Sequence, residues 1–124
     1  MPVRDELVRL GSHDSAQAEA VVHELLALPA DRRPTALFAG NNRNTVGALH
    51  ALRKADRALA LVGFDDFELA DVLGTTVVRH DTSQMGAHGA ALAFGRLEGG
   101  AGAPRRVVVP TELVVRGSGE LPPA

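Results

Sequence analysis

The stretch from Ala58 to Phe67 constrains the fold of this chain more than any other segment. It joins an unbroken apolar run, Ala58–Val62, to a glycine, a phenylalanine and two adjacent carboxylates, Asp65 and Asp66. Short continuous apolar runs that end in turn residues are typical of fully buried strands, which occur mainly in parallel sheets. Open α/β sheets bind their ligands at the carboxyl ends of such strands. Asp65 and Asp66 are therefore the first candidates for a functional site.

The rest of the chain alternates strand-like and helix-like segments. This pattern predicts an α/β fold with a parallel sheet and helices on both faces. Asp14 with Gln17, and Asp81 with Gln84, have the spacing of capping boxes before two of the helices. Gly47 is expected to let its helix approach the sheet closely. Strands are predicted at residues 7–10, 35–38, 58–62, 75–79, 106–109 and 112–116, and helices at residues 15–28, 44–54, 67–73 and 83–97.

The composition excludes several classes of protein. There is no cysteine, which rules out disulfides, thiolate metal sites and cysteine nucleophiles. The net charge is −2 with no basic block, which argues against a surface that follows nucleic-acid phosphates. We expect a cytoplasmic protein without a membrane partner, because no signal peptide or membrane-length apolar run is visible. The length of 124 residues suits one domain, expected at residues 1–118, with a disordered tail at residues 119–124.

The two adjacent aspartates have three possible roles. Asp65 can accept hydrogen bonds from the hydroxyl or amine groups of a small polar ligand. Asp66 can cap the helix predicted from Phe67. A third role is a Mg²⁺ site, for which paired carboxylates at a strand end are suitable ligands. Such a site also needs a third acidic ligand and usually a lysine, and neither stands at another strand end.

Two further strand ends carry polar side chains. Asn41 and Asn42 follow one predicted strand, and their amides either bind a polar ligand or form a turn and a helix cap. His80 follows another, and its spacing from His88 is not that of a helical metal pair. Because parallel strands end at one edge of a sheet, we expect Asn41, Asp65 and His80 to form one polar cleft. No metal site and no cofactor are predicted.

Four segments, in this order and at this spacing, carry a resemblance to a known family. They are Pro34–Asn42 continued by Val46–Leu49, Leu61–Asp66, Thr75–His80 and Pro110–Ser118. Together they resemble the corresponding segments of LacI/GalR-type transcriptional regulators. The resemblance covers nearly the whole chain.

The resemblance implies a periplasmic-binding-protein-like effector domain, here mostly one lobe and incomplete. In this family, sugars or related small molecules bind between two lobes and change how a dimer presents a helix-turn-helix to operator DNA. Position by position, the resemblance implies that Asn41 and Asp65 contact the effector. His80 stands where glutamine is common and is expected to face the cleft. It also implies no enzymatic activity, and a homodimer formed through residues 46–53 and 67–72.

The chain departs from the family pattern at three places. The helix-turn-helix, the hinge helix and most of the amino-terminal lobe are expected to be absent, so operator DNA would be contacted only by a part outside this chain. One loop is shortened to Ala55–Arg57, and Leu73–Gly74 replaces a double proline. Two alternatives to effector binding remain open. One is a small metal-dependent α/β enzyme that uses Asp65 and Asp66, and the other is a truncated remnant without ligand affinity.

Overall fold

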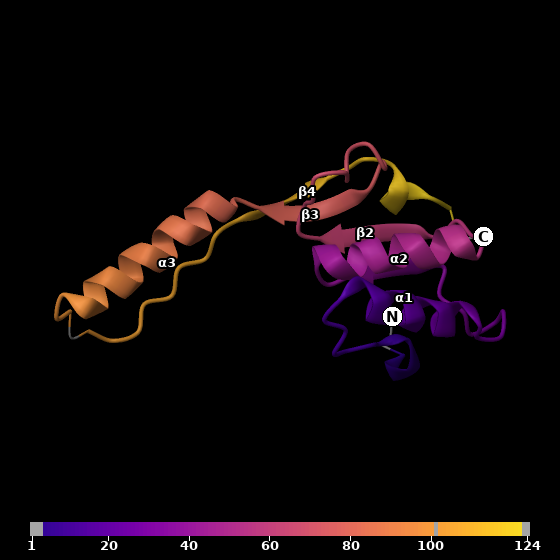
Figure 1. Cartoon of the computed structure of the whole chain (residues 1–124), viewed down its shortest axis with the longest axis horizontal. Coiled ribbons are helices and arrows are strands. Elements are labelled where there is room, and N and C mark those ends of the chain that lie inside the picture. The colour runs from indigo at the N-terminus through magenta and orange to yellow at the C-terminus, as the bar shows by residue number, and fades with distance from the viewer. Residues whose placement is uncertain (1–3, 101, 123–124) are drawn as a thin grey trace.

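The computed structural model describes residues 4–100 and 102–122 of the chain. The regular elements are α1 (Ser15–Leu26), β1 (Ala36–Ala39), α2 (Asn42–Lys54), β2 (Ala60–Phe64), β3 (Thr76–His80), α3 (Thr82–Leu97) and β4 (Thr111–Val114), with 3₁₀ turns η1 (Asp5–Leu7) and η2 (Ser118–Glu120). The sheet, α1 and α2 form a body, from which α3 and the segment after it project as an arm (Figure 1). None of the described helices is long and apolar enough to cross a membrane.

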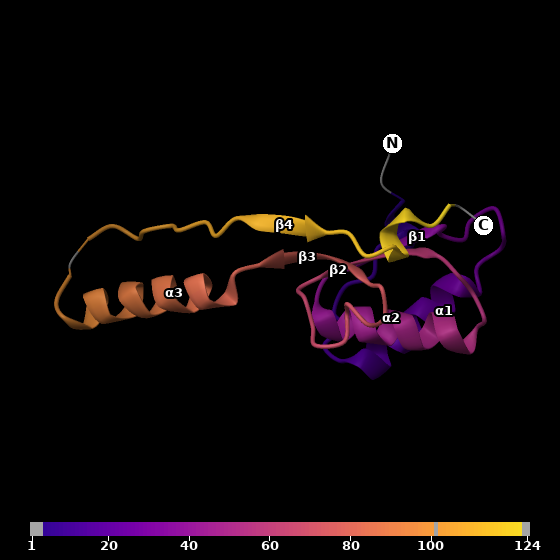
Figure 2. The same ribbon diagram turned by 90° about the horizontal axis from the view of Figure 1, so that it is seen from above.

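The four strands form one mixed sheet in the order β1-β2-β3-β4. β1, β2 and β3 run parallel, as predicted, and β4 pairs antiparallel with β3. The pairing of β3 with β4 sets Arg79 opposite Glu112 and His80 opposite Thr111. β4 is antiparallel because the arm returns the chain to the end of β3 from which it left (Figure 2), whereas a parallel strand needs a crossover connection.

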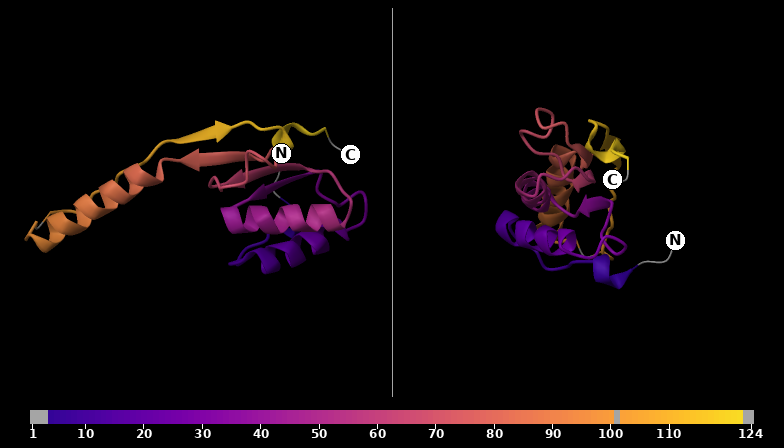
Figure 3. Two further views of the ribbon diagram at one scale, coloured as in Figure 1. Left: turned by 45° about the horizontal axis from the view of Figure 1, so that its top comes forward. Right: turned by 90° about the vertical axis from the view of Figure 1, so that its right-hand side faces the viewer.

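One face of the sheet is covered by α2, and α1 packs against α2 (Figure 3). The buried core consists of Val22, Ala39, Ala48, Ala51, Leu52, Leu59 and Leu61. Gly47 allows the two helices to approach, because a Cβ added there would lie 2.4 Å from the backbone oxygen of Ser15. The prediction that Gly47 approaches the sheet is therefore wrong, since its close neighbour is α1.

The other face of the sheet meets η2 rather than an α-helix. The Ser118 hydroxyl donates to the Leu61 carbonyl at 2.6 Å and accepts from the Thr76 amide at 2.8 Å. Gly119 lies against Val62 and Thr76. The sequence predicts helices on both faces of the sheet. In the structure, α1 and α2 lie on one face, and the 3₁₀ turn η2 lies on the other. Residues 119 and 120 of the expected tail lie in η2, and residues 123–124 are outside the described residues.

Local side-chain signals explain where the helices begin. Asp14, Asn41 and Asp81 cap α1, α2 and α3, and each accepts a hydrogen bond from the backbone N–H three residues further on. The caps predicted at Asp14 and Asp81 are confirmed. Asn41 also belongs to the predicted ligand site, and the oxygen of its side chain is occupied by this cap.

Three predicted elements are wrong. Residues 8–10 have no regular structure after η1, and residues 106–109 are likewise irregular, because β-branched runs form strands only when they have a partner strand. Residues 68–74 form turns rather than a helix, since a segment of two turns hardly offsets the cost of helix nucleation. These turns end at Gly74, whose φ of +63° suits glycine.

The arm is the least packed part of the described structure. α3 has 16 residues and none of them is buried. Phe94 and Leu97 are 63% and 80% exposed. The segment after α3 runs back beside it toward β4 (Figure 2). The arm therefore lacks the packing that stabilises α1 and α2.

Candidate functional site

Asp65 marks the carboxyl end of β2. Its φ of +68° lies in the left-handed region, which aspartate tolerates better than most residues with a Cβ. Its N–H donates to the carbonyl of Val78 in β3 at 2.9 Å, which holds the turn against the neighbouring strand. The backbone therefore turns at Asp65, close to the place where β3 also ends.

His80 is the last residue of β3 and lies beside Asp65. Its Nδ1 is 3.4 Å from Oδ1 of Asp65. The His80 side chain is 13% exposed and that of Asp65 is 34% exposed, so the carboxylate is the more accessible of the two. The Phe64 ring lies 6.2 Å from the imidazole, measured between ring centroids. The predicted meeting of these two strand ends is thus present in the structure.

Two hollows adjoin this pair. The first, of about 430 Å³, is lined by Asn42, Asp65, Asp66, Arg79, His80 and Thr82. The second, of about 470 Å³, is lined by Arg79, His80, Asp81, Thr82, Pro110, Thr111 and Glu112. The lining offers carboxylate, imidazole, amide, hydroxyl and guanidinium groups, which are the partners that a ligand rich in hydroxyl groups requires.

Asn41 has a different place from the one expected. Its Oδ1 accepts from the Asn44 amide at 2.8 Å and so caps α2. Asn42, the first residue of α2, lines the first hollow instead. The side-chain oxygen of Asn41 is therefore occupied by the helix. Sequence reasoning recognised the Asn41–Asn42 pair but not which member reaches the hollow, and it missed Thr82, which lies two residues beyond the end of β3.

Asp66 is bound by Arg116, a residue that sequence reasoning did not single out. The Arg116 guanidinium donates to both carboxylate oxygens, at 2.9 and 2.8 Å, and to the Thr75 carbonyl at 3.2 Å. The hydrogen bonds from Arg116 lower the pKa of Asp66 below its usual range. The expectation that Asp66 caps a helix is wrong, because the chain from Phe67 forms no helix. The backbone N–H that donates to the Asp66 carboxylate belongs to the adjacent Phe67, at 3.0 Å.

The two adjacent carboxylates consequently have different partners, His80 for Asp65 and Arg116 for Asp66. Within residues 4–100 and 102–122, no three histidine, aspartate or glutamate side chains are arranged to hold a metal ion. The pairing of Asp66 with Arg116 leaves Asp65 as the accessible acceptor of the two.

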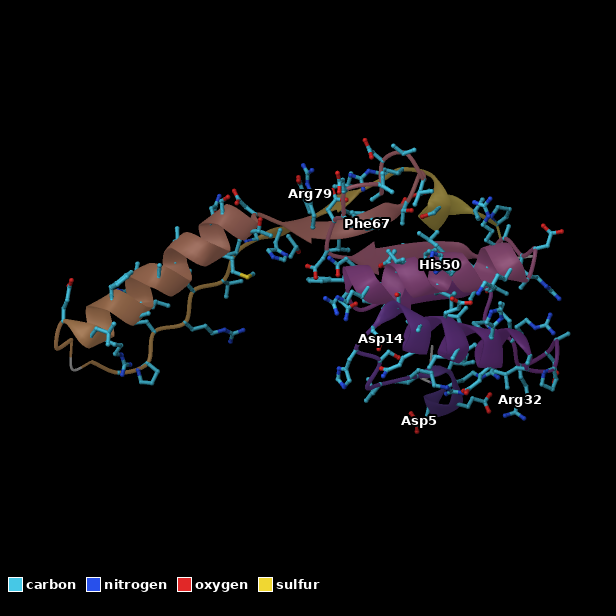
Figure 4. All side chains as sticks on the ribbon, in the orientation of Figure 1. Asp5, Asp14, Arg32, His50, Phe67 and Arg79 are labelled. Carbon is cyan, nitrogen blue, oxygen red and sulfur yellow. The ribbon has the colours of Figure 1, made fainter. Side chains whose placement is uncertain are left out.

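Arg79 lies between the body and the arm. It projects from β3 on the side away from α2 (Figure 4). Its guanidinium forms an ion pair with Glu112 on β4, and one of its nitrogens is 3.9 Å from Oδ2 of Asp66. The positive charge beside the hollow is therefore shared between two acidic groups.

An open α/β sheet with polar groups at the ends of its parallel strands defines a small-molecule-binding domain. Residues 2–119 match the family of the periplasmic binding protein-like domain. The chain is 34% identical to the HTH-type transcriptional regulator CelR of Thermobifida fusca, over 96% of this chain and 36% of CelR.

Solved structures give the same result. The CelR–cellobiose complex superimposes with a TM-score of 0.82 at 34% identity, over 96% of this chain and 38% of that one. A LacI-family regulatory protein from Chloroflexus aggregans superimposes with a TM-score of 0.79 at 26% identity, over 95% of this chain and 44% of that one. A LacI-family regulator from Lactobacillus casei with bound sucrose superimposes with a TM-score of 0.67 at 25% identity, over 86% of this chain and 41% of that one.

The chain belongs to the periplasmic-binding-protein-like domain family, in the form found in the effector-binding domain of LacI-type regulators. It spans less than half the length of each of these relatives. The fold class and the family resemblance read from the sequence are confirmed.

Proposed function

We propose that this chain binds a sugar or a related small polar effector, as part of a LacI-type transcriptional regulator. The observation that carries the proposal is the Asp65–His80 pair, which stands 3.4 Å apart at the edge of a polar hollow. The similarity to a CelR–cellobiose complex and to a sucrose-bound regulator supports a carbohydrate as the ligand class.

The residues have distinct proposed roles. Asp65 accepts hydrogen bonds from one or two ligand hydroxyls, because its carboxylate is the accessible member of the pair. His80 contributes a ring nitrogen at the same place. Asn42 lines the hollow. Asn41 is outside that lining and its side-chain oxygen caps α2, so a contact from Asn41 to the ligand would use the N–H groups of its amide. Thr82 adds a hydroxyl at the start of α3.

Several wider properties belong to the same proposal. The relatives are transcriptional regulators, which supports a protein that catalyses no reaction. We propose a homodimer in the cytoplasm, which acts on operator DNA through a helix-turn-helix outside these 124 residues. These properties rest on the family, because the chain spans only part of its relatives.

Isothermal titration calorimetry of the 124-residue chain with cellobiose, sucrose and glucose tests ligand binding. We expect one of these sugars to bind, and Asp65→Asn to weaken its binding at least about tenfold, because an amide replaces a charged acceptor. Asp31→Asn is the matched control, since Asp31 is exposed and does not line the hollow. Failure of all three sugars to bind, or equal binding by the Asp65→Asn variant, would contradict the proposal.

A further inference from the structure

We propose that His80, in addition to its own contact with the ligand, acts through Asp65 and makes effector binding sensitive to pH. The neutral imidazole leaves the Asp65 carboxylate available to ligand hydroxyls, and the protonated imidazole pairs with that carboxylate and competes with the ligand. This inference rests on the proposed function, because it concerns the same carboxylate.

The geometry of the pair is suited to such competition. A separation of 3.4 Å between Nδ1 and Oδ1 is long for a hydrogen bond, so the contact in the described state is loose. Charge-assisted N–H···O contacts are shorter, at about 2.8 Å. Protonation of His80 would therefore draw the Asp65 carboxylate toward the imidazole, and the closer contact would occupy a carboxylate oxygen that otherwise accepts from a ligand. Histidine is the side chain that ordinarily changes its charge between about pH 5 and pH 8.

The imidazole is held in place by its surroundings. Its side chain is only 13% exposed, the Phe64 ring lies on one side, and Thr111 stands opposite on β4. His80 is also within a strand that is paired with β4. When the charge of His80 changes, the Asp65 carboxylate is therefore expected to move rather than the imidazole ring.

The other charged groups near His80 already have partners. Asp66 is bound by Arg116, Arg79 is paired with Glu112, and the Asp81 carboxylate caps α3. Among these groups, Asp65 is the acid in ion-pair range of the imidazole. A protonated His80 would therefore act mainly on Asp65.

The test compares cellobiose affinity at about pH 7.5 and about pH 5.5, on either side of the range in which an imidazole titrates. The proteins are the wild-type chain, His80→Gln and His88→Gln. Glutamine forms hydrogen bonds without changing charge, and His88 is an exposed residue of α3, which makes it the matched control. We expect the wild-type affinity to fall roughly fivefold in acid, the factor that one ion pair at a partly exposed site supplies.

The ratio of the two dissociation constants is the readout, so a change in absolute affinity caused by the substitution does not matter. We expect a ratio near one in His80→Gln and the wild-type ratio in His88→Gln. Equal ratios in His80→Gln and wild type, or a wild-type ratio of one, would overturn the inference and leave the proposed function intact.

A second measurement does not require a ligand. The backbone amide signal of Asp65, followed by NMR, should shift between about pH 5 and pH 8 in the wild-type chain and in His88→Gln, and not in His80→Gln. An Asp65 signal that is constant over this range in the wild-type chain would overturn the inference. If cellobiose does not bind at either pH, the result counts against cellobiose as the ligand, and the NMR titration decides the role of His80.

Discussion

Arg116 holds Asp66 by two parallel hydrogen bonds, of 2.9 and 2.8 Å, across a separation of 50 residues in the sequence. The pair joins the end of β2 to the segment that leaves β4. It is partly buried, with the Asp66 side chain 28% exposed and the Arg116 side chain 16% exposed. Asp66 lines the first hollow, but Arg116 occupies both of its carboxylate oxygens, which leaves Asp65 as the freer acceptor there.

Asp66→Asn is expected to lower the free energy of unfolding by about 1–3 kcal/mol. The amide cannot accept both guanidinium hydrogen bonds, and Arg116 would be left partly buried without its counter-charge. Urea unfolding followed by circular dichroism measures the change. Asp31→Asn, at an exposed position, should change the same quantity by no more than about 0.5 kcal/mol. Equal stability of the Asp66→Asn and wild-type chains would contradict this account.

Acid should weaken the chain partly through Asp66. Folding lowers the pKa of Asp66, so its carboxylate stabilises the folded chain fully at pH values above the pKa that it has in the unfolded chain. This stability is lost as the pH falls through the lowered pKa. The stability difference between wild type and Asp66→Asn should therefore be largest near neutral pH and shrink in acid.

The difference between the two proteins, and not the wild-type curve, is the quantity to measure. Hydrogen bonds from Arg32 and then Arg4 lower the pKa of Glu6 to about 2, so Glu6 shifts the wild-type curve in the same direction. Urea midpoints from about pH 7 to about pH 3 give this difference. A difference that stays constant over that range would show that Asp66 stabilises the fold by something other than its charge.

Gly47→Ala is expected to destabilise the body by about 1–3 kcal/mol, even though alanine favours a helix by roughly 1 kcal/mol. The new Cβ would lie 2.4 Å from the Ser15 carbonyl oxygen and 2.7 Å from the Cβ of Ala18, which forces α1 and α2 apart. Gly86→Ala is the control, because a Cβ at Gly86 meets nothing within 4 Å. Thermal unfolding measures the stability of both variants. An equal loss of stability in Gly47→Ala and Gly86→Ala would contradict the packing described here.

The amide hydrogens of α3 should exchange with solvent much faster than those of α2. α3 buries no residue, whereas α2 buries five, so opening α3 breaks few packing contacts. Hydrogen exchange followed by mass spectrometry or NMR measures the two rates. Equal protection of α3 and α2 at every protein concentration would show that the arm is stabilised by contacts other than those described.

Much of the body could be predicted from local pattern. Most of the apolar run before Gly63 lies in β2, the carboxylates of Asp14 and Asp81 cap their helices, and Asp65 and His80 meet at neighbouring strand ends. These features depend on residues that are close in sequence or on the rule that parallel strands end at one edge. The strand predicted at residues 7–10 failed because its formation depends on a neighbouring strand, which local pattern does not reveal.

The sequence alone determined which segments are apolar, where helices begin and which polar residues stand at strand ends. Only the tertiary structure decided how those residues are used. It assigned the Asn41 oxygen to α2, Gly47 to the contact with α1, and Asp66 to Arg116. The physical reason is that periodicity tells which face of an element is buried, whereas the identity of the group against that face depends on chain segments far away in the sequence.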